Sequence, residues 1–177
     1  DRLGVASLIE LIKDTPRNLE ILFAFTVQEE IGRRGAMVAA YGFKPDMAFI
    51  VDATPSFDMP GWEEAENTRY NTHLGCGPAI YLSDAGTIYD PRMIRFILTL
   101  AEEYHIPYQF RQPGTGYTDS AGIYINRNGV SSISISIPIR YPHTPISHAK
   151  IEDWGNTLSL LKLALYNADR SILAVDR

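Results

Sequence analysis

The chain has 177 residues and a net charge of −5; 45% of the residues are hydrophobic and 21% are charged. This composition is ordinary for a globular protein with one substantial core, and it argues against a nucleic-acid partner because no cluster of Lys and Arg would neutralise phosphates. No apolar run approaches the ~20 residues that span a bilayer, so we expect no membrane partner. The single cysteine, Cys76, excludes an internal disulfide and a cysteine-based zinc site, and it suits a cytoplasmic location.

The first third of the chain predicts a helix followed by a β-α-β unit. Apolar side chains recur at helical spacing over residues 5–12, and Pro16 ends this helix. A buried strand is predicted over residues 19–27, a helix over 33–41 and a second strand over 47–52. The two strands should be parallel and joined by a right-handed crossover.

After a long loop at 53–73, short strands, helices and glycine-rich turns alternate. Asp90 and Pro91 are the residue types of a helix N-cap and a first helical position. Strict alternation of Ser and Ile over residues 131–138 predicts a strand with one apolar face. The other predicted elements are strands at 79–82 and 108–111, a helix of about 14 residues from Asp90, and helices over 119–127 and 154–165. Residues 1–177 are therefore expected to form a single α/β domain, a three-layer α/β/α sandwich around a mostly parallel mixed sheet.

Side chains that can bind a metal stand at the ends of three predicted strands. Glu29 and Glu30 follow the first strand, Asp52 ends the second, and His143 follows the strand at 131–138. Ligands bind at the carboxyl ends of strands in open α/β sheets, and a set of imidazole and carboxylates suits zinc, cobalt or manganese. The alternative is that the two glutamates are solvated turn residues that cap the next helix.

Five segments together resemble a known family: VQEEIGRRGA, FIVDAT, LGCGPAI, GTGYTDSAG and SIPIRYPHTP. In this order they are similar to the glutamyl-aminopeptidase and tetrahedral-aminopeptidase family of co-catalytic metallopeptidases. The resemblance implies the zinc-exopeptidase fold, release of the amino-terminal residue from peptides with a free amino terminus, and a homo-oligomer between a dimer and a tetrahedral dodecamer. The chain starts at a helix pattern without Met, so we expect the carboxyl-terminal part of a larger catalytic domain, without its upstream part and inserted dimerisation domain.

The resemblance also implies roles for residues of this sequence. Glu29 matches the family's general base, which takes a proton from a metal-bridging water and returns it to the leaving amine. Glu30 and His143 match ligands of one divalent metal, and Asp52 matches a ligand of a second. The expected cofactors are two zinc or cobalt ions, with manganese as a further candidate.

The resemblance assigns a role less firmly to two residues, and the sequence departs from the family pattern at other positions. Thr118 and Asp119 match a loop near the substrate, and Asp119 has the alternative role of capping the helix that it starts. The family has two further ligands, an upstream His and an Asp that bridges the metals. Asp1 either follows that bridging position or occupies it. Ser147 stands where the family usually has Glu.

Two other functions compete with a metallo-aminopeptidase. A non-catalytic scaffold or binding protein on the same fold is consistent with the missing ligands and with Ser147. An endoglucanase-like glycoside hydrolase would need two carboxyl groups that face each other about 5–9 Å apart. Glu29 and Glu30 are adjacent and point apart, which makes them a poor pair for that reaction.

Overall fold

The serine–isoleucine run forms the central strand of the sheet, β4 (Ser131–Arg140). On one edge it pairs in parallel with β1 (Met47–Pro55), and on the other it pairs antiparallel with β2 (Ala79–Ile80). Two short strands complete the sheet: β3 (Gln109–Phe110) is parallel to β2, and β5 (His148–Ala149) is antiparallel to the end of β4. The longest ladder, β1 with β4, is parallel, so the predicted mostly parallel mixed sheet is confirmed.

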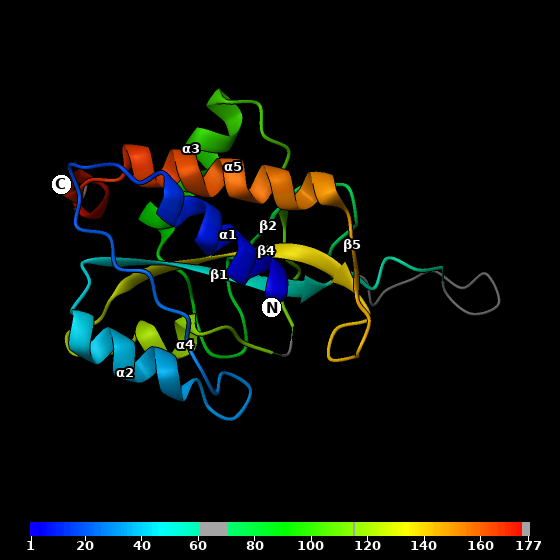
Figure 1. Ribbon diagram of the computed structural model, residues 1–177, viewed down its shortest axis with the longest axis horizontal. Helices are drawn as coiled ribbons and strands as arrows, with labels where there is room; N and C mark the ends of the chain where they lie inside the picture. The colour runs from blue at the N-terminus through cyan, green and yellow to red at the C-terminus, as the bar shows by residue number, and fades with distance from the viewer. Residues whose placement is uncertain (61–70, 115, 175–177) are drawn as a thin grey trace.

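Helices cover both faces of this sheet in the computed structural model, which describes residues 1–60, 71–114 and 116–174 (Figure 1). One layer consists of α1 (Arg2–Lys13), α3 (Pro91–Glu103) and α5 (Ile151–Asn167), and the other of α2 (Arg34–Phe43) and α4 (Ser120–Ile123). A 3-10 turn, η2 (Arg170–Leu173), follows α5. The predicted three-layer architecture is confirmed. No helix in the described ranges is long and apolar enough to cross a membrane.

Both faces of β4 are buried, although the sequence predicted one apolar face. Ile133, Ile135 and Ile137 are fully buried in the core below α3 and α5. The serines of the opposite face are equally buried, because α4 and its flanking loop cover them; they are Ser132, Ser134 and Ser136. Their hydroxyls are paired: that of Ser132 lies 2.7 Å from the hydroxyl of Ser120, and a buried polar group with a partner carries little penalty.

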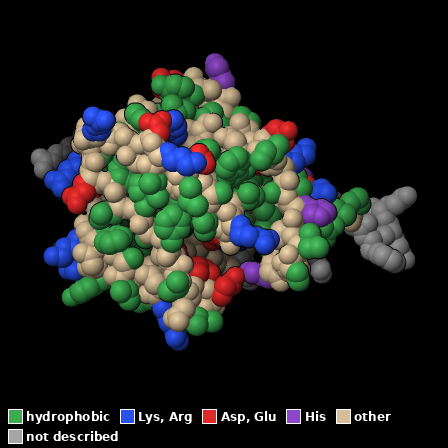
Figure 2. Space-filling view, in the orientation of Figure 1, with side chains coloured by type: hydrophobic (Ala, Val, Ile, Leu, Met, Phe, Trp, Pro, Cys, Tyr) green, Lys and Arg blue, Asp and Glu red, His purple; other side chains and the backbone are tan. Residues whose placement is uncertain are grey.

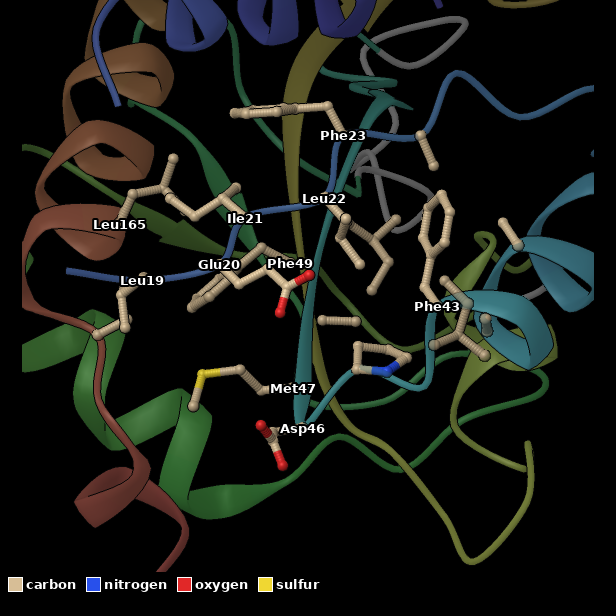
Figure 3. Close-up of a pocket in the computed structure, with 18 of the residues that line it drawn as sticks. Leu19, Glu20, Ile21, Leu22, Phe23, Phe43, Asp46, Met47, Phe49 and Leu165 are labelled. Carbon is tan, nitrogen blue, oxygen red and sulfur yellow. The ribbon is translucent and has the colours of Figure 1, made fainter. Parts of the chain in front are cut away.

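Residues 19–27 do not form a strand, so this prediction was wrong, and so was the β-α-β unit that included it. The segment is extended, but no ladder hydrogen bond joins it to a strand of the described chain. A cavity of about 520 Å³ separates it from β1 (Figure 3). Leu22, Phe25 and Val27 are 46%, 49% and 66% exposed. An apolar sequence favours a strand, but the strand needs a neighbouring backbone, and this segment has none.

The other elements follow the predictions with shifted ends. Asp90 caps α3, since its side chain accepts a hydrogen bond from the backbone N–H of Arg92, and Pro91 is the first helical residue. The predicted helix at 119–127 shortens to the four residues of α4, in a stretch where Gly122 and Asn126 disfavour a longer helix. Within the predicted loop at 53–73, residues 53–55 belong to β1, and residues 61–70 lie outside the described part of the chain.

Candidate metal and peptidase site

A tight turn before α2 places the two adjacent glutamates. The backbone carbonyl of Glu29 accepts hydrogen bonds from the N–H groups of Gly32 and Arg33, at 3.1 and 2.8 Å. Gly35 packs so closely on the preceding chain that a Cβ there would lie 2.6 Å from the backbone of Val27. Gln28 adopts a left-handed conformation with φ of 61°. This turn therefore fixes Glu29 and Glu30 relative to the sheet.

Four residues predicted as site residues line one cavity of about 950 Å³: Glu29, Glu30, Asp52 and His143. The closest contact among them joins Oε1 of Glu30 to Nε2 of His143, at 2.9 Å. Both of these side chains are exposed, at 71% and 77%. Figure 2 shows acidic side chains gathered next to a histidine on this face of the molecule. The structure thus brings together residues that lie more than 110 positions apart in the sequence.

Two acidic side chains that line the cavity, Asp52 and Glu29, have raised pKa values. Burial raises the pKa of Asp52 to about 7, with a smaller contribution from the charge of Glu29, while a hydrogen bond from the N–H of Ala53 acts against the rise. Burial also raises the pKa of Glu29, helped by the charges of Asp119 and Glu30. Carboxylates that are held together out of water favour a cation or a proton between them. The electrostatics therefore suit a site for a positively charged ligand.

One cation already lies close to these carboxylates. The guanidinium of Arg33 stacks on the ring of Tyr117, 4.3 Å from its centroid, and its charge lowers the pKa values of Glu29 and Asp119 against the stronger effect of burial. The carboxylate of Asp1 accepts a hydrogen bond from the N–H of Gly4 at 2.8 Å and so caps α1.

The residues present match a metal site in chemistry but supply only part of a ligand set. Glu30 and His143 offer a carboxylate oxygen and an imidazole nitrogen in contact, which are suitable donors for zinc or cobalt. Across the described ranges, no group of three or more His, Cys, Asp or Glu side chains is gathered closely enough to hold a metal ion. Asp52 lies in the same cavity without completing such a group.

Thr118 and Asp119 are not among the residues that line the cavity with the two glutamates, although the charge of Asp119 acts on both Glu29 and Asp52. The hydroxyl of Thr118 is buried 2.7 Å from that of Ser134, on the sheet face below α4. Asp119 accepts a hydrogen bond from the hydroxyl of Thr26, and it makes no side-chain cap bond to α4. Their predicted role in substrate binding stays a prediction, and Asp119 acts on the site through its charge on Glu29.

Sequence reasoning missed several residues of the cavity wall. Tyr81, Asn71 and Arg111 are all buried and line it together with Gln112 and Tyr117. Arg111 directly follows β3, so the position at a strand end was a signal that could have pointed to it. Nothing comparable marks Tyr81, whose place in the wall depends on how β2 packs beside β4.

Known proteins of one family are similar to this chain. The family model of the M42 glutamyl aminopeptidases matches residues 1–160. The chain belongs to the M42 glutamyl aminopeptidase family. A putative aminopeptidase of Acetivibrio thermocellus is 37% identical to it over 166 residues, which are 93% of this chain and 49% of that protein.

Solved structures of M42 relatives have the same fold. An aminopeptidase from the archaeon Desulfurococcus kamchatkensis superposes with a TM-score of 0.86 at 35% identity, over 98% of this chain and 49% of that one. The Pyrococcus horikoshii TET1 peptidase, which can assemble into a tetrahedron or a large octahedral shell, gives a TM-score of 0.79 at 30% identity, over 95% of this chain and 48% of that one. The chain thus spans about half the length of the relatives that it matches.

Hydrogen bonds within residues 141–147 hold the loop that carries His143. The hydroxyls of Ser147 and Thr144 both donate to the backbone carbonyl of Tyr141, at 3.1 and 2.7 Å. Ser147 therefore ties the end of the loop to its beginning. Tyr141 and His143 both have positive φ, 59° and 55°. Positive φ in residues other than glycine is uncommon, and such strain is often found at functional sites.

Proposed function

We propose that the protein is a metal-dependent aminopeptidase that removes the amino-terminal residue from peptides. The observation that carries this proposal is the single cavity lined by Glu29, Glu30, Asp52 and His143, with a contact of 2.9 Å between Glu30 and His143. Membership of the M42 family supports the same reaction.

The proposed cofactors are two divalent ions, zinc or cobalt, with manganese as a further candidate. Glu30 and His143 would hold one ion and Asp52 would contribute to the second. Bound there, such ions polarise the scissile carbonyl and lower the pKa of a water. The donor types and the raised pKa of Asp52 support this assignment.

Glu29 is proposed as the general base. Its raised pKa brings its proton affinity closer to neutral pH, where a base can both accept a proton from the attacking water and release it to the leaving amine. The turn at residues 29–33 holds its backbone in place through the two hydrogen bonds to its carbonyl. Arg33 lies near enough to moderate its charge.

The proposal extends to partners and location by similarity. Peptides with a free amino terminus are the proposed substrates, and a homo-oligomer between a dimer and a dodecamer is the proposed assembly, since the similar TET1 peptidase forms closed shells. The proposed location is the cytoplasm. Of the competing functions, a non-catalytic scaffold is tested by the experiment below, and a glycoside hydrolase is disfavoured by the family match.

The test is hydrolysis of aminoacyl-anilides by the protein expressed from its complete coding sequence. Leucyl, glutamyl and lysyl anilides are compared with and without added zinc or cobalt, and with an N-acetylated control. Metal-dependent cleavage that fails on the acetylated substrate is the expected result. A metal-loaded protein that cleaves none of the anilides would instead favour the non-catalytic scaffold.

A further inference from the structure

Asp119 is a half-buried acid that is joined by one hydrogen bond to the segment just before the two glutamates. Its Oδ2 accepts this bond from the hydroxyl of Thr26, which stands three residues before Glu29. Its other oxygen, Oδ1, is buried and has no hydrogen-bond partner in the part of the chain that the structure describes. Burial raises the pKa of Asp119, so its charged form is disfavoured in the folded protein. The stability of the fold alone therefore does not favour an acid at this position.

The central strand of the sheet fixes the backbone around Asp119. The hydroxyl of Thr118, on one side of it, lies 2.7 Å from that of Ser134 in β4. The hydroxyl of Ser120, on the other side, lies 2.7 Å from that of Ser132 in the same strand. All four of these hydroxyl side chains are buried. Asp119 is thus held between two residues that are bound to β4.

The residues that follow Asp119 also contact the helix on the far side of the glutamate turn. Figure 1 shows α4 beside α2, the helix into which that turn leads. The side-chain amide of Asn126 donates to the carbonyl of Met37 in α2, at 3.0 Å. Gly122 packs so closely on α2 that a Cβ there would lie 2.8 Å from Cγ of Met37. Residues 119–126 therefore contact both arms of the turn, Thr26 before it and α2 after it.

We propose that Asp119 is a positioning residue, which holds the turn of Glu29 in its catalytic geometry through the hydrogen bond from Thr26. The inference rests on the proposed aminopeptidase function, and it gives Asp119 a role other than the substrate binding that the resemblance implies. A hydrogen bond from a hydroxyl to a carboxylate is stronger than one between neutral groups. A misplacement of about 1 Å near the reacting atoms can lower turnover about 100-fold, so one anchor beside the turn can affect kcat.

The first experiment removes the hydroxyl of Thr26 from the protein expressed from its complete coding sequence. Thr26→Val keeps the shape of the side chain, and Thr26→Ser keeps the hydroxyl. For the leucyl anilide, we expect Thr26→Val to lower kcat about 10-fold with KM changed less than about threefold, because the bond acts on the turn and not on the substrate. Thr26→Ser should keep kcat within about threefold of the wild type, since it still donates to Asp119.

The second experiment tests whether the two residues act through the same bond. Asp119→Ala should lower kcat by about 10-fold or more, again with little change in KM. Adding Thr26→Val to Asp119→Ala should lower kcat less than about twofold further, because the acceptor of the hydroxyl is already absent. A general loss of stability would not produce this dependence of one substitution on the other.

Ser131→Ala is a matched control at the other end of β4. The hydroxyl of Ser131 also donates to a partly buried carboxylate, Oδ2 of Asp90, at 2.6 Å, and neither residue lines the candidate site. Ser131→Ala should lower the urea midpoint of unfolding but keep kcat within about twofold of the wild type. The same urea denaturation shows whether each variant is folded.

The possible outcomes are distinct. A wild-type protein that cleaves the leucyl anilide, together with a folded Thr26→Val of unchanged kcat, overturns the inference and leaves the proposed function intact. Equal falls caused by Thr26→Val with and without Asp119 also overturn it, and so does a raised KM with unchanged kcat, which indicates substrate binding. If Thr26→Val does not fold, Thr26→Ala removes the same hydroxyl and replaces it in both comparisons. A wild-type protein that cleaves no anilide overturns the proposed function and this inference with it.

Discussion

Glu30 and His143 are in contact at 2.9 Å although both side chains are more than two-thirds exposed. An ion pair this exposed contributes about 0–1 kcal/mol to stability, so the contact stabilises the fold very little. If the two side chains are metal ligands, in contrast, their main contribution is to the affinity for the ion. His143→Ala is therefore expected to change the free energy of unfolding by less than about 1 kcal/mol but to weaken zinc binding more than about 10-fold.

Calorimetric zinc titration and urea denaturation of the same preparation measure both quantities. His148→Ala is the matched control, because His148 lies in the same region and packs edge-on against Tyr141 without contacting Glu30. If the two histidine variants bind zinc equally well, His143 is not a ligand.

Replacing the proposed general base should separate catalysis from metal binding. Glu29→Gln keeps the shape of the side chain but cannot accept a proton, so turnover of the leucyl anilide should fall by about 100-fold or more. Zinc affinity should change little, because Glu29 is not assigned as a ligand. Steady-state kinetics and metal analysis on one sample decide this. Near-normal turnover in the folded variant would remove Glu29 from the role proposed for it.

The buried carboxylate of Asp153 is predicted to be a structural anchor. It is fully buried near the start of α5 and accepts hydrogen bonds from the backbone N–H groups of Gly75 and Gly77, at 2.7 and 2.8 Å. Asp153→Ala would leave both donors without a partner and should lower the free energy of unfolding by about 3 kcal/mol. Urea denaturation measures the loss. The exposed neighbour Glu152 is the control, and Glu152→Gln should change stability by less than about 0.5 kcal/mol.

The cap of α3 gives stability a defined pH dependence. Hydrogen bonds from Arg92, and then from Ser131, lower the pKa of Asp90 from 3.8 to about 2. Because the folded-state pKa is the lower one, the stabilisation is fully present above about pH 4 and is lost as the pH falls toward 2. The expected contribution is about 2 kcal/mol.

Unfolding free energies of the wild type and of Asp90→Asn, measured between pH 5 and pH 2, test this dependence. The difference between the two proteins should shrink as the pH falls. A constant difference across that range would show that Asp90 has an ordinary pKa in the folded protein.

Local signals explain which elements the sequence predicted well. The cap at Asp90, the proline at position 91 and the helical spacing of residues 5–12 are properties of a few neighbouring residues, and α3 and α1 form as expected. The segment at 19–27 has an equally strong apolar signal and still forms no strand. Its failure is non-local, because a strand is completed by a second backbone that the sequence of the segment does not specify.

The same distinction holds for the candidate site. Strand ends pointed to Glu30, Asp52 and His143, because a change from apolar to polar residues is visible in the sequence. The contact between Glu30 and His143, and the high pKa of Asp52, depend on how distant segments pack. Arg111 also stands at the end of a predicted strand, but that its side chain lines this cavity depends on the pairing of the two-residue strands β2 and β3.

The free edge of β1 has a practical consequence for work with this chain. In the part that the structure describes, β1 pairs with β4 on one edge only, and the other edge faces the apolar cavity in front of residues 19–26. Exposed strand edges are templates for the backbone of another molecule. A preparation of the 177-residue chain alone is therefore expected to self-associate as its concentration rises, and its handling will depend on keeping that edge occupied or charged.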